Sequence, residues 1–234
     1  MQRHIVGLSG GKDSVAMALR LREVAPANYE YICNETGNEL PEMRDHWKRL
    51  EDLLQTTITP VKYHTDLEGA IKEQNMLPNV FSRWCTRLLK IEPTIKFFDS
   101  LDEDAILYVG LRADEEIRRG LYGEDITVKF PMREWKWGIE DVVSYLEQKG
   151  VCIPERTDCA WCPYQRLGEW RSLYFKHPVI YMQAVQIEKE RGHTFRSPGR
   201  DNWPADLESL AKEFDSGRKL RNYSRQNTCR VCSL

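Results

Sequence analysis

The feature that most constrains this chain is a short loop between a strand and a helix near the amino end. Residues 4–8 are apolar enough for a buried strand, and residues 13–24 carry apolar side chains at helical spacing. Between these segments lies the run Ser9-Gly10-Gly11-Lys12-Asp13-Ser14. Glycines let backbone N–H groups approach an anion closely, and the first turn of a helix adds partial positive charge. The run therefore predicts a phosphate-binding loop, in which Lys12 supplies a full charge and Ser9 and Ser14 supply hydroxyl donors.

This loop differs from the two common glycine-rich nucleotide loops. Its glycines and lysine are too close together for Gly-x-x-x-x-Gly-Lys-Ser/Thr, and it lacks the spacing of Gly-x-Gly-x-x-Gly. The alternative is a glycine turn that only caps the helix. The position of the run, directly after a strand, favours ligand binding.

The rest of the chain alternates strands and helices before its texture changes. We expect further strands at residues 29–33, 57–63, 105–109 and 126–130, and helices at 41–54, 67–75, 86–99 and 139–150. This alternation predicts an α/β domain over residues 1–150 with a doubly wound, mostly parallel sheet. Residues 151–234 are expected to form a helical, cysteine-bearing region, with helices near 178–191 and 204–215.

Composition limits the cellular context. The formal net charge of −2 gives no global attraction to nucleic acid, so any such binding needs a local patch. No apolar run approaches the ~18–20 residues of a membrane span, and the amino end enters a strand at once. We therefore expect a cytoplasmic protein. There its seven cysteines stay reduced, and paired spacings suggest metal or redox chemistry.

Five further motifs complete a family resemblance. They are Glu35-Thr36-Gly37-Asn38-Glu39-Leu40-Pro41-Glu42, the run from Trp84-Cys85-Thr86-Arg87 to Pro93, Gly110-Leu111-Arg112-Ala113-Asp114-Glu115, Phe130-Pro131-Met132-Arg133-Glu134-Trp135 and Cys159-Ala160-Trp161-Cys162-Pro163. With the first loop they resemble the phosphoadenosine phosphosulfate (PAPS) reductase family of the PP-loop superfamily, over nearly the whole chain. The resemblance implies an enzyme that binds an adenine nucleotide on Ser9–Ser14, Gly37, Gly110 and Arg112.

Two departures from the reductases favour ATP as the nucleotide. Sulfonucleotide reductases have a degenerate phosphate loop, whereas this chain keeps Lys12 and Asp13. They also end in a Glu-Cys-Gly-aliphatic-His segment, whereas residues 228–234 read Thr-Cys-Arg-Val-Cys-Ser-Leu. The resemblance then implies adenylylation of a substrate with pyrophosphate release for sulfur transfer. The alternatives are a PAPS or adenosine phosphosulfate reductase that makes sulfite, with Cys232 as a catalytic thiol, and a non-catalytic nucleotide-binding module.

The cysteines suggest a metal centre. Cys159 and Cys162 have the spacing with which one loop grips a metal. Iron–sulfur relatives carry a Cys-Cys pair where this chain has Trp84-Cys85, so the resemblance implies a 4Fe–4S cluster on Cys85, Cys159 and Cys162. The remaining iron would bind an exogenous sulfide, or Cys229 or Cys232 would supply the fourth ligand. A structural Zn²⁺ and the absence of any metal are the alternatives. Cys33, within a strand, is expected in the core, and Cys229 with Cys232 could instead form a catalytic dithiol or an idle tail.

Other positions complete the expected site. In the family, an arginine at the position of Arg112 helps to hold phosphate or sulfate; a salt bridge with Asp114 or Glu115 is the alternative. Asp13 is the best candidate for Mg²⁺, ahead of Glu35 and Glu39, since this ion prefers oxygen ligands. We expect Lys12, Asp13 and Arg112 to act in catalysis.

The expected partners follow from the same reading. Residues 217–230 carry five basic side chains and no acid, which suits a nucleic-acid substrate or a solvated tail. A sulfur donor or a thioredoxin-type reductant would serve the two enzymatic alternatives, and a homo-oligomer is compatible with the sequence. The aromatic residues of 161–181 are expected to lie in the core rather than to stack on bases.

Overall fold

The computed structural model describes residues 2–115 and 122–220. It contains two compact units. The first unit holds Met1–His64 and Thr86–Thr157, and the second holds Thr65–Cys85 together with the described residues from Asp158 onward. The sequence predicts two domains that are each one continuous segment, residues 1–150 and 151–234. This division stays a prediction.

The grouping of residues 65–85 with the second unit has a visible cause. Their loop is bonded to the later part of the chain: the Tyr164 hydroxyl donates to the Val80 carbonyl at 3.0 Å, and Arg191 Nη1 donates to Asn75 Oδ1 at 2.7 Å. Such contacts connect segments about 80 or more residues apart. Periodicity along the chain carries no signal for them.

The first unit is built on a parallel sheet in the order β3-β2-β1-β4-β5. Its strands are β1 (Arg3–Gly7), β2 (Tyr29–Asn34), β3 (Ile58–Val61), β4 (Ala105–Tyr108) and β5 (Thr127–Lys129). The chain winds outward from β1 to β3, returns to the centre, and winds the other way through β4 and β5. The direction reverses between β1 and β4, and ligands of doubly wound folds bind at the carboxyl ends of the strands at this point.

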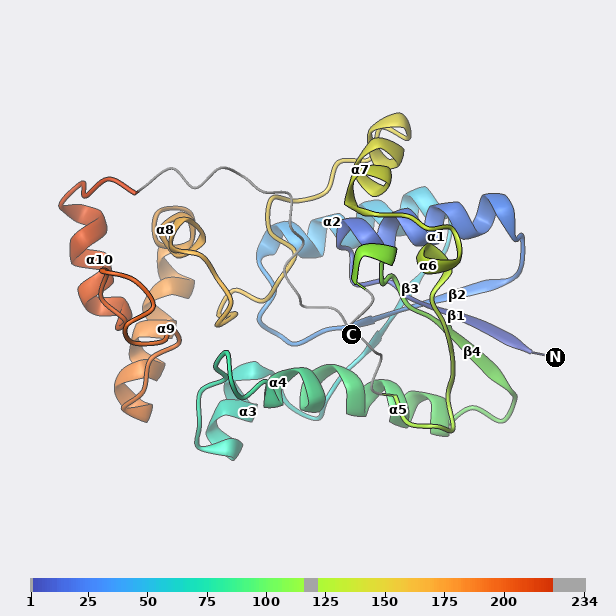
Figure 1. The fold of residues 1–234 in the computed structure, drawn as a ribbon. Coiled ribbons are helices and arrows are strands. Elements are labelled where there is room, and N and C mark those ends of the chain that lie inside the picture. The colour runs from blue at the N-terminus through green and yellow to red at the C-terminus, as the bar shows by residue number, and fades with distance from the viewer. Residues whose placement is uncertain (1, 116–121, 221–234) are drawn as a thin grey trace. The chain divides into compact units, whose positions relative to one another are not determined.

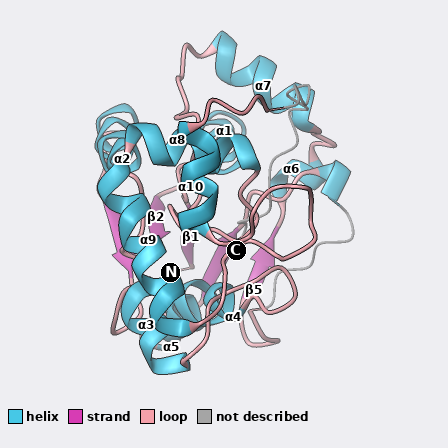
Figure 2. Ribbon diagram, turned by 90° about the vertical axis from the view of Figure 1, so that its left-hand side faces the viewer, coloured by secondary structure: helices cyan, strands magenta, loops and turns pink. Residues whose placement is uncertain are grey.

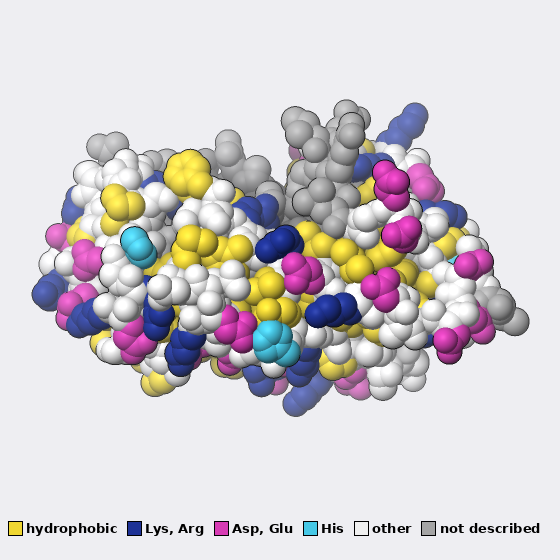
Figure 3. Space-filling view, turned by 90° about the horizontal axis from the view of Figure 1, so that it is seen from below, with side chains coloured by type: hydrophobic (Ala, Val, Ile, Leu, Met, Phe, Trp, Pro, Cys, Tyr) yellow, Lys and Arg dark blue, Asp and Glu magenta, His cyan; other side chains and the backbone are white. Residues whose placement is uncertain are grey.

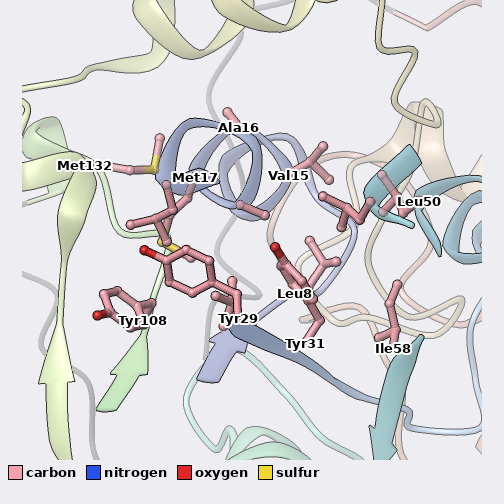
Figure 4. Close-up of a cluster of buried hydrophobic side chains, with 14 of the residues drawn as sticks. Leu8, Val15, Ala16, Met17, Tyr29, Tyr31, Leu50, Ile58, Tyr108 and Met132 are labelled. Carbon is pink, nitrogen blue, oxygen red and sulfur yellow. The ribbon is translucent and has the colours of Figure 1, made fainter. Parts of the chain in front are cut away.

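Helices cover both faces of the sheet (Figure 1). One face carries α1 (Lys12–Val24), α2 (Pro41–Leu54), α6 (Pro131–Glu134) and α7 (Ile139–Gln148), and the other carries the π-helical turn η1 (Arg87–Ile91) and α5 (Glu92–Asp99). Figure 4 shows the core of the first face, where Val15, Ala16 and Met17 of α1 lie over Tyr29 and Tyr31 of β2. This buried layer fixes the start of α1 against the end of β1.

The described part of the second unit consists of helices and loops (Figure 2). Its main helices are α3 (Leu67–Gln74), α8 (Leu167–Lys176), α9 (Pro178–Arg191) and α10 (Leu207–Asp215). Trp161, Trp170 and Tyr181 are buried, which confirms the expected core role for half of the six aromatic residues. Tyr164 and Tyr174 are half-buried, and Phe175 has 55% of its surface exposed.

Glu188 gives the second unit a pH-dependent stability. Its two carboxyl oxygens accept the backbone N–H groups of Phe195 at 2.8 Å and Leu207 at 2.7 Å, and the residue is 6% exposed. Burial raises the pKa of Glu188 to about 7; Asp206 also raises it, while the two backbone N–H groups and Arg196 lower it.

A carboxyl whose folded-state pKa exceeds its unfolded value stabilises the fold most when it is protonated. We therefore expect the free energy of unfolding to fall by up to about 3 kcal/mol as the pH rises from roughly 4.5 to 7, and to level off above that. Urea denaturation across this range, compared with Glu188→Gln, measures the contribution. Equal pH slopes in the two proteins would contradict it.

The α/β fold class and the parallel sheet were predicted correctly. The prediction missed three short elements and α8. The short ones are α4 (Trp84–Thr86), the 3-10 turn η2 (Ala113–Glu115) and α6. No helix within the described residues is both long and apolar enough to span a bilayer. The cytoplasmic location stays a prediction.

Candidate functional site

The glycine loop lies at the point where the sheet reverses direction. It follows β1 directly, and α1 begins at Lys12 with Gly11 as its N-cap. Gly10 has φ +86°, in the left-handed region that favours glycine. The first N–H groups of a helix have no partner within it, so they are available to an anion. The loop therefore has the backbone geometry that a phosphate-binding loop requires.

The loop after β4 touches this helix start. A Cβ added to Gly110 would lie 3.1 Å from the backbone nitrogen and Cα of Ser14, so a larger residue would require the start of α1 to shift by a few tenths of an ångström. The structure therefore brings Ser9–Ser14, Gly110 and Arg112 together, although about 100 residues separate the two segments. Gly37 follows β2, the parallel neighbour of β1, and has φ +73°; its role in nucleotide binding stays a prediction.

Asp13 and Arg112 form a buried ion pair at the centre of the site. Arg112 Nη1 donates to Asp13 Oδ2 at 2.8 Å, and Arg112 Nε donates to Asp114 Oδ1 at 2.8 Å. Glu115 Oε2 lies 3.7 Å from Nη1. The expected contacts of Arg112 with Asp114 and Glu115 are present, but the guanidinium is only 4% exposed, so they are not a surface salt bridge. Burial alone would lower the pKa of Arg112, and the surrounding carboxylates, Asp13 foremost, raise it above its ordinary value.

The second carboxyl oxygen of Asp13 is available to a ligand. Oδ1 is buried and accepts no hydrogen bond from any described residue. A buried carboxylate oxygen without a partner is costly, and a hard cation would satisfy it. This orphaned oxygen fits the predicted Mg²⁺ role, which stays a prediction.

Lys12 stands at the helix start with its charge unused. The residue is half-buried, and among the described residues its ammonium has neither an ion pair nor a hydrogen bond. An unpaired lysine at the positive end of a helix repels other cations and attracts anions. It complements the phosphate-binding geometry of the loop.

Sequence reasoning missed two residues of α2 that hold the loop. His46 Nε2 lies 3.0 Å from the Gly10 carbonyl oxygen, and Trp47 Nε1 donates to the Ser9 carbonyl at 3.1 Å. The sequence predicts a helix at 41–54, in which Trp47 has the spacing of the apolar face. The polar His46 at a buried position of the same helix was the one available signal.

The acidic loop after β2 is engaged in its own contacts. Glu39 Oε1 accepts from the Thr36 backbone N–H at 2.7 Å and from the Thr36 hydroxyl at 2.6 Å. Glu35 pairs with Lys62 at 2.5 Å and with Arg44 at 4.0 Å. These bonds order the loop, while the other carboxyl oxygen of Glu39, Oε2, is buried and accepts no hydrogen bond from any described residue, as is Asp13 Oδ1.

The cysteine loop is a tight turn in the second unit. The Cys162 N–H donates to the Cys159 carbonyl at 3.1 Å; Cys162 is buried, and Cys159 and Cys85 are half-buried. Cys33 is 5% exposed and burial raises the pKa of its thiol to about 12, which confirms its place in the core.

The predicted metal centre is not assembled by the described residues. Among them, no group of three or more His, Cys, Asp or Glu side chains is placed to hold a metal ion. The roles of Cys85, Cys159 and Cys162 as metal ligands therefore stay predictions. The predicted ligand Cys229 and the predicted catalytic thiol Cys232 lie outside the described residues, and these assignments stay predictions.

The predicted nucleic-acid contact also remains untested. Most of the basic segment 217–230 lies outside the described residues. On the face drawn in Figure 3, acidic and basic side chains are interspersed.

A parallel doubly wound sheet with Ser-Gly-Gly-Lys-Asp-Ser at its switch point defines the PP-loop class of α/β proteins. Residues 3–172 match the family model of the phosphoadenosine phosphosulfate reductase domain, and the chain belongs to this family.

Individual relatives are distant. An uncharacterised protein of Methanocaldococcus jannaschii is 24% identical over 203 residues, which are 80% of this chain and 41% of that protein. The chain thus spans about two fifths of the length of this curated relative. The fold is similar to a PAPS reductase from Candida auris solved as a phosphate complex, with a TM-score of 0.51 and 17% identity over 66% of this chain and 75% of that one. A U34-tRNA thiolase from Methanococcus maripaludis with its 4Fe–4S cluster gives 0.47 and 18% over 99% and 79%.

Proposed function

We propose that this chain binds ATP on its Ser9–Ser14 loop and adenylylates a substrate with release of pyrophosphate, in preparation for sulfur transfer. The observation that carries the proposal is the loop itself: an open helix start, the unpaired Lys12 and the orphaned Asp13 Oδ1 meet at the switch point of the sheet. Lysine and aspartate beside the two glycines suit a triphosphate and its cation.

In this mechanism the loop binds the phosphates and the substrate attacks the α phosphorus. A substrate oxygen forms the new P–O bond as the bond to the β-phosphate oxygen breaks. Lys12 and the N–H groups at the start of α1 offset the negative charge that gathers on the departing pyrophosphate. Asp13 Oδ1 would hold Mg²⁺, which supplies Lewis-acid stabilisation of the phosphoryl oxygens. Arg112 fixes the orientation of the Asp13 carboxylate through its 2.8 Å hydrogen bond to Oδ2.

Lys12→Ala provides the central test of this proposal. We expect it to lower AMP and pyrophosphate formation from ATP by roughly 100-fold, the scale associated with loss of one charge-stabilising donor. Lys48→Ala is the control, because Lys48 is an exposed lysine of α2. Equal rates for wild type and Lys12→Ala would contradict the proposed mechanism.

A second candidate is reduction of a sulfonucleotide to sulfite, which the family match over residues 3–172 favours. It requires a thiol nucleophile, for which Cys232 is the candidate. Sulfite release from PAPS with a thioredoxin-type donor, lost in Cys232→Ser, would support it against ATP cleavage. Tight ATP binding with neither activity would instead indicate a non-catalytic module.

A further inference from the structure

We propose that His46 and Trp47 of α2 are positioning residues that turn the carbonyls of the phosphate loop away from the bound anion. This inference rests on the proposed function and adds a device that orients the loop. Three consecutive loop carbonyls each meet a side chain. Trp47 Nε1 lies 3.1 Å from Ser9 O, His46 Nε2 lies 3.0 Å from Gly10 O, and Ser14 Oγ lies 3.0 Å from Gly11 O.

The hydrogen bonds to the loop carbonyls also determine where the backbone N–H groups of the loop point. All peptide bonds of the described residues are trans, and in a trans peptide the C=O and the following N–H point in opposite directions. Fixing the carbonyls of Ser9 and Gly10 towards α2 therefore aims the N–H groups of Gly10 and Gly11 away from that helix. The Gly11 carbonyl points along α1, because it also accepts the Val15 N–H at 3.0 Å. The Lys12 N–H belongs to the same peptide unit and therefore points out of the start of α1.

The resulting row of N–H groups suits a phosphoanion. Successive backbone N–H groups that converge without their carbonyls form an anion-binding concavity. A carbonyl rotated into the same space would repel phosphate oxygens. The Gly11 N–H has only a long contact of 3.4 Å with Ser9 Oγ, which an anion can displace.

Packing makes the bracing by α2 specific. A Cβ on Gly10 would lie 2.8 Å from both Met43 Cε and Trp47 Nε1, so the loop is pressed directly against α2. His46 is 1% exposed, and its burial lowers the pKa of the imidazole, which is therefore neutral at pH 7. A neutral imidazole has one N–H, and because the Gly10 carbonyl can only accept, that proton lies on Nε2. Nδ1 is buried and has no hydrogen-bond partner among the described residues, so the bond to Gly10 is the polar contact that places His46.

The proposal is tested with the full chain by isothermal titration with ATP and with inorganic pyrophosphate. We expect His46→Leu to weaken both affinities by about tenfold or more, because loss of one hydrogen bond to a buried carbonyl costs on the order of 1–3 kcal/mol. Trp47→Phe, which deletes only the indole donor, is expected to weaken them several-fold. His46→Gln can place an amide donor near the position of Nε2 and should restore most of the affinity.

Leu50→Ala separates positioning from stability. Leu50 lies one turn further along α2, is 1% exposed and belongs to the core. This variant should lower the melting temperature, because it leaves a cavity in the core. The affinities should stay within about threefold of wild type, because Leu50 makes no hydrogen bond to the carbonyls of the loop.

The outcomes distinguish the two proposals. If the wild type binds ATP and pyrophosphate, and His46→Leu and Trp47→Phe bind them equally well, the positioning role is wrong and the proposed function stands. If affinity falls only in proportion to melting temperature, with Leu50→Ala as weak as His46→Leu, the role is structural and the inference fails. If the wild type binds neither probe, both proposals fail. Should His46→Leu not fold, Trp47→Phe and His46→Gln decide the matter.

Discussion

Arg112→Met is expected to lower the free energy of unfolding by about 3–5 kcal/mol, the cost typical of removing one partner from a buried ion pair. Methionine fills a similar volume, but it leaves the Asp13 carboxylate buried without a counter-charge. The Asp13 and Arg112 side chains are 11% and 5% exposed, so water does little to compensate. Asp114 and Glu115 would add further negative charge around the position from which the guanidinium has been removed. Urea denaturation at pH 7 measures the loss.

Arg3→Met is the matched control. Arg3 makes the same kind of bond with Glu30, at 2.8 Å and 2.6 Å, but these side chains are 32% and 40% exposed. Exposed ion pairs contribute about 0–1 kcal/mol, so this variant should be nearly neutral. Adding Asp13→Asn to Arg112→Met should recover part of the loss. Equal, small losses for Arg112→Met and Arg3→Met would show that the buried pair is not a major source of stability.

The fold was predictable because its elements carry local signals. All five strands were expected within two residues of their observed ends, since most are short apolar runs bounded by turn residues. The helix at Pro178–Arg191 was predicted at its observed bounds, because Pro178 and Gly192 mark its two ends. By contrast, α8 follows closely on the cysteine turn and was missed.

The predicted helix over residues 86–99 illustrates a second limit. The structure divides this region into α4, the π-helical turn η1 and α5, which begins with Glu92 and Pro93 at its first two positions. Proline lacks a backbone N–H and interrupts the regular bonding of a helix. The pattern of apolar residues spans such a change of helix type without showing it.

The site was predictable where one segment carries its chemistry. The run Ser9–Ser14 could be interpreted from its residues, and the strand order places it at the switch point. The pairing of Asp13 with Arg112 joins residues 99 apart, and His46 reaches Gly10 from 36 residues away. Such contacts depend on how the helices pack over the sheet. No spacing rule within the sequence predicts them.

Gly10→Ala is expected to have the other large effect, because it combines backbone strain with a steric conflict. At φ +86° a non-glycine residue costs on the order of 1–3 kcal/mol. The new Cβ would also lie 2.8 Å from Met43 Cε and Trp47 Nε1, so Trp47 must move and give up its bond to the Ser9 carbonyl. Together these terms predict a loss of about 3 kcal/mol or more in the free energy of unfolding and a weakening of ATP affinity by at least tenfold.

Gly123→Ala isolates the steric part of that effect. Gly123 has φ +83°, close to the φ of Gly10, but no atom of the described residues lies within 4 Å of the position its Cβ would take. This control should show the backbone strain alone, a smaller loss of stability with unchanged ATP affinity. Urea denaturation and isothermal titration of the two variants therefore compare one conformation with and without a helix pressed against it. If Gly10→Ala behaved like Gly123→Ala in both measurements, the contact between α2 and the loop would have no part in stability or nucleotide binding.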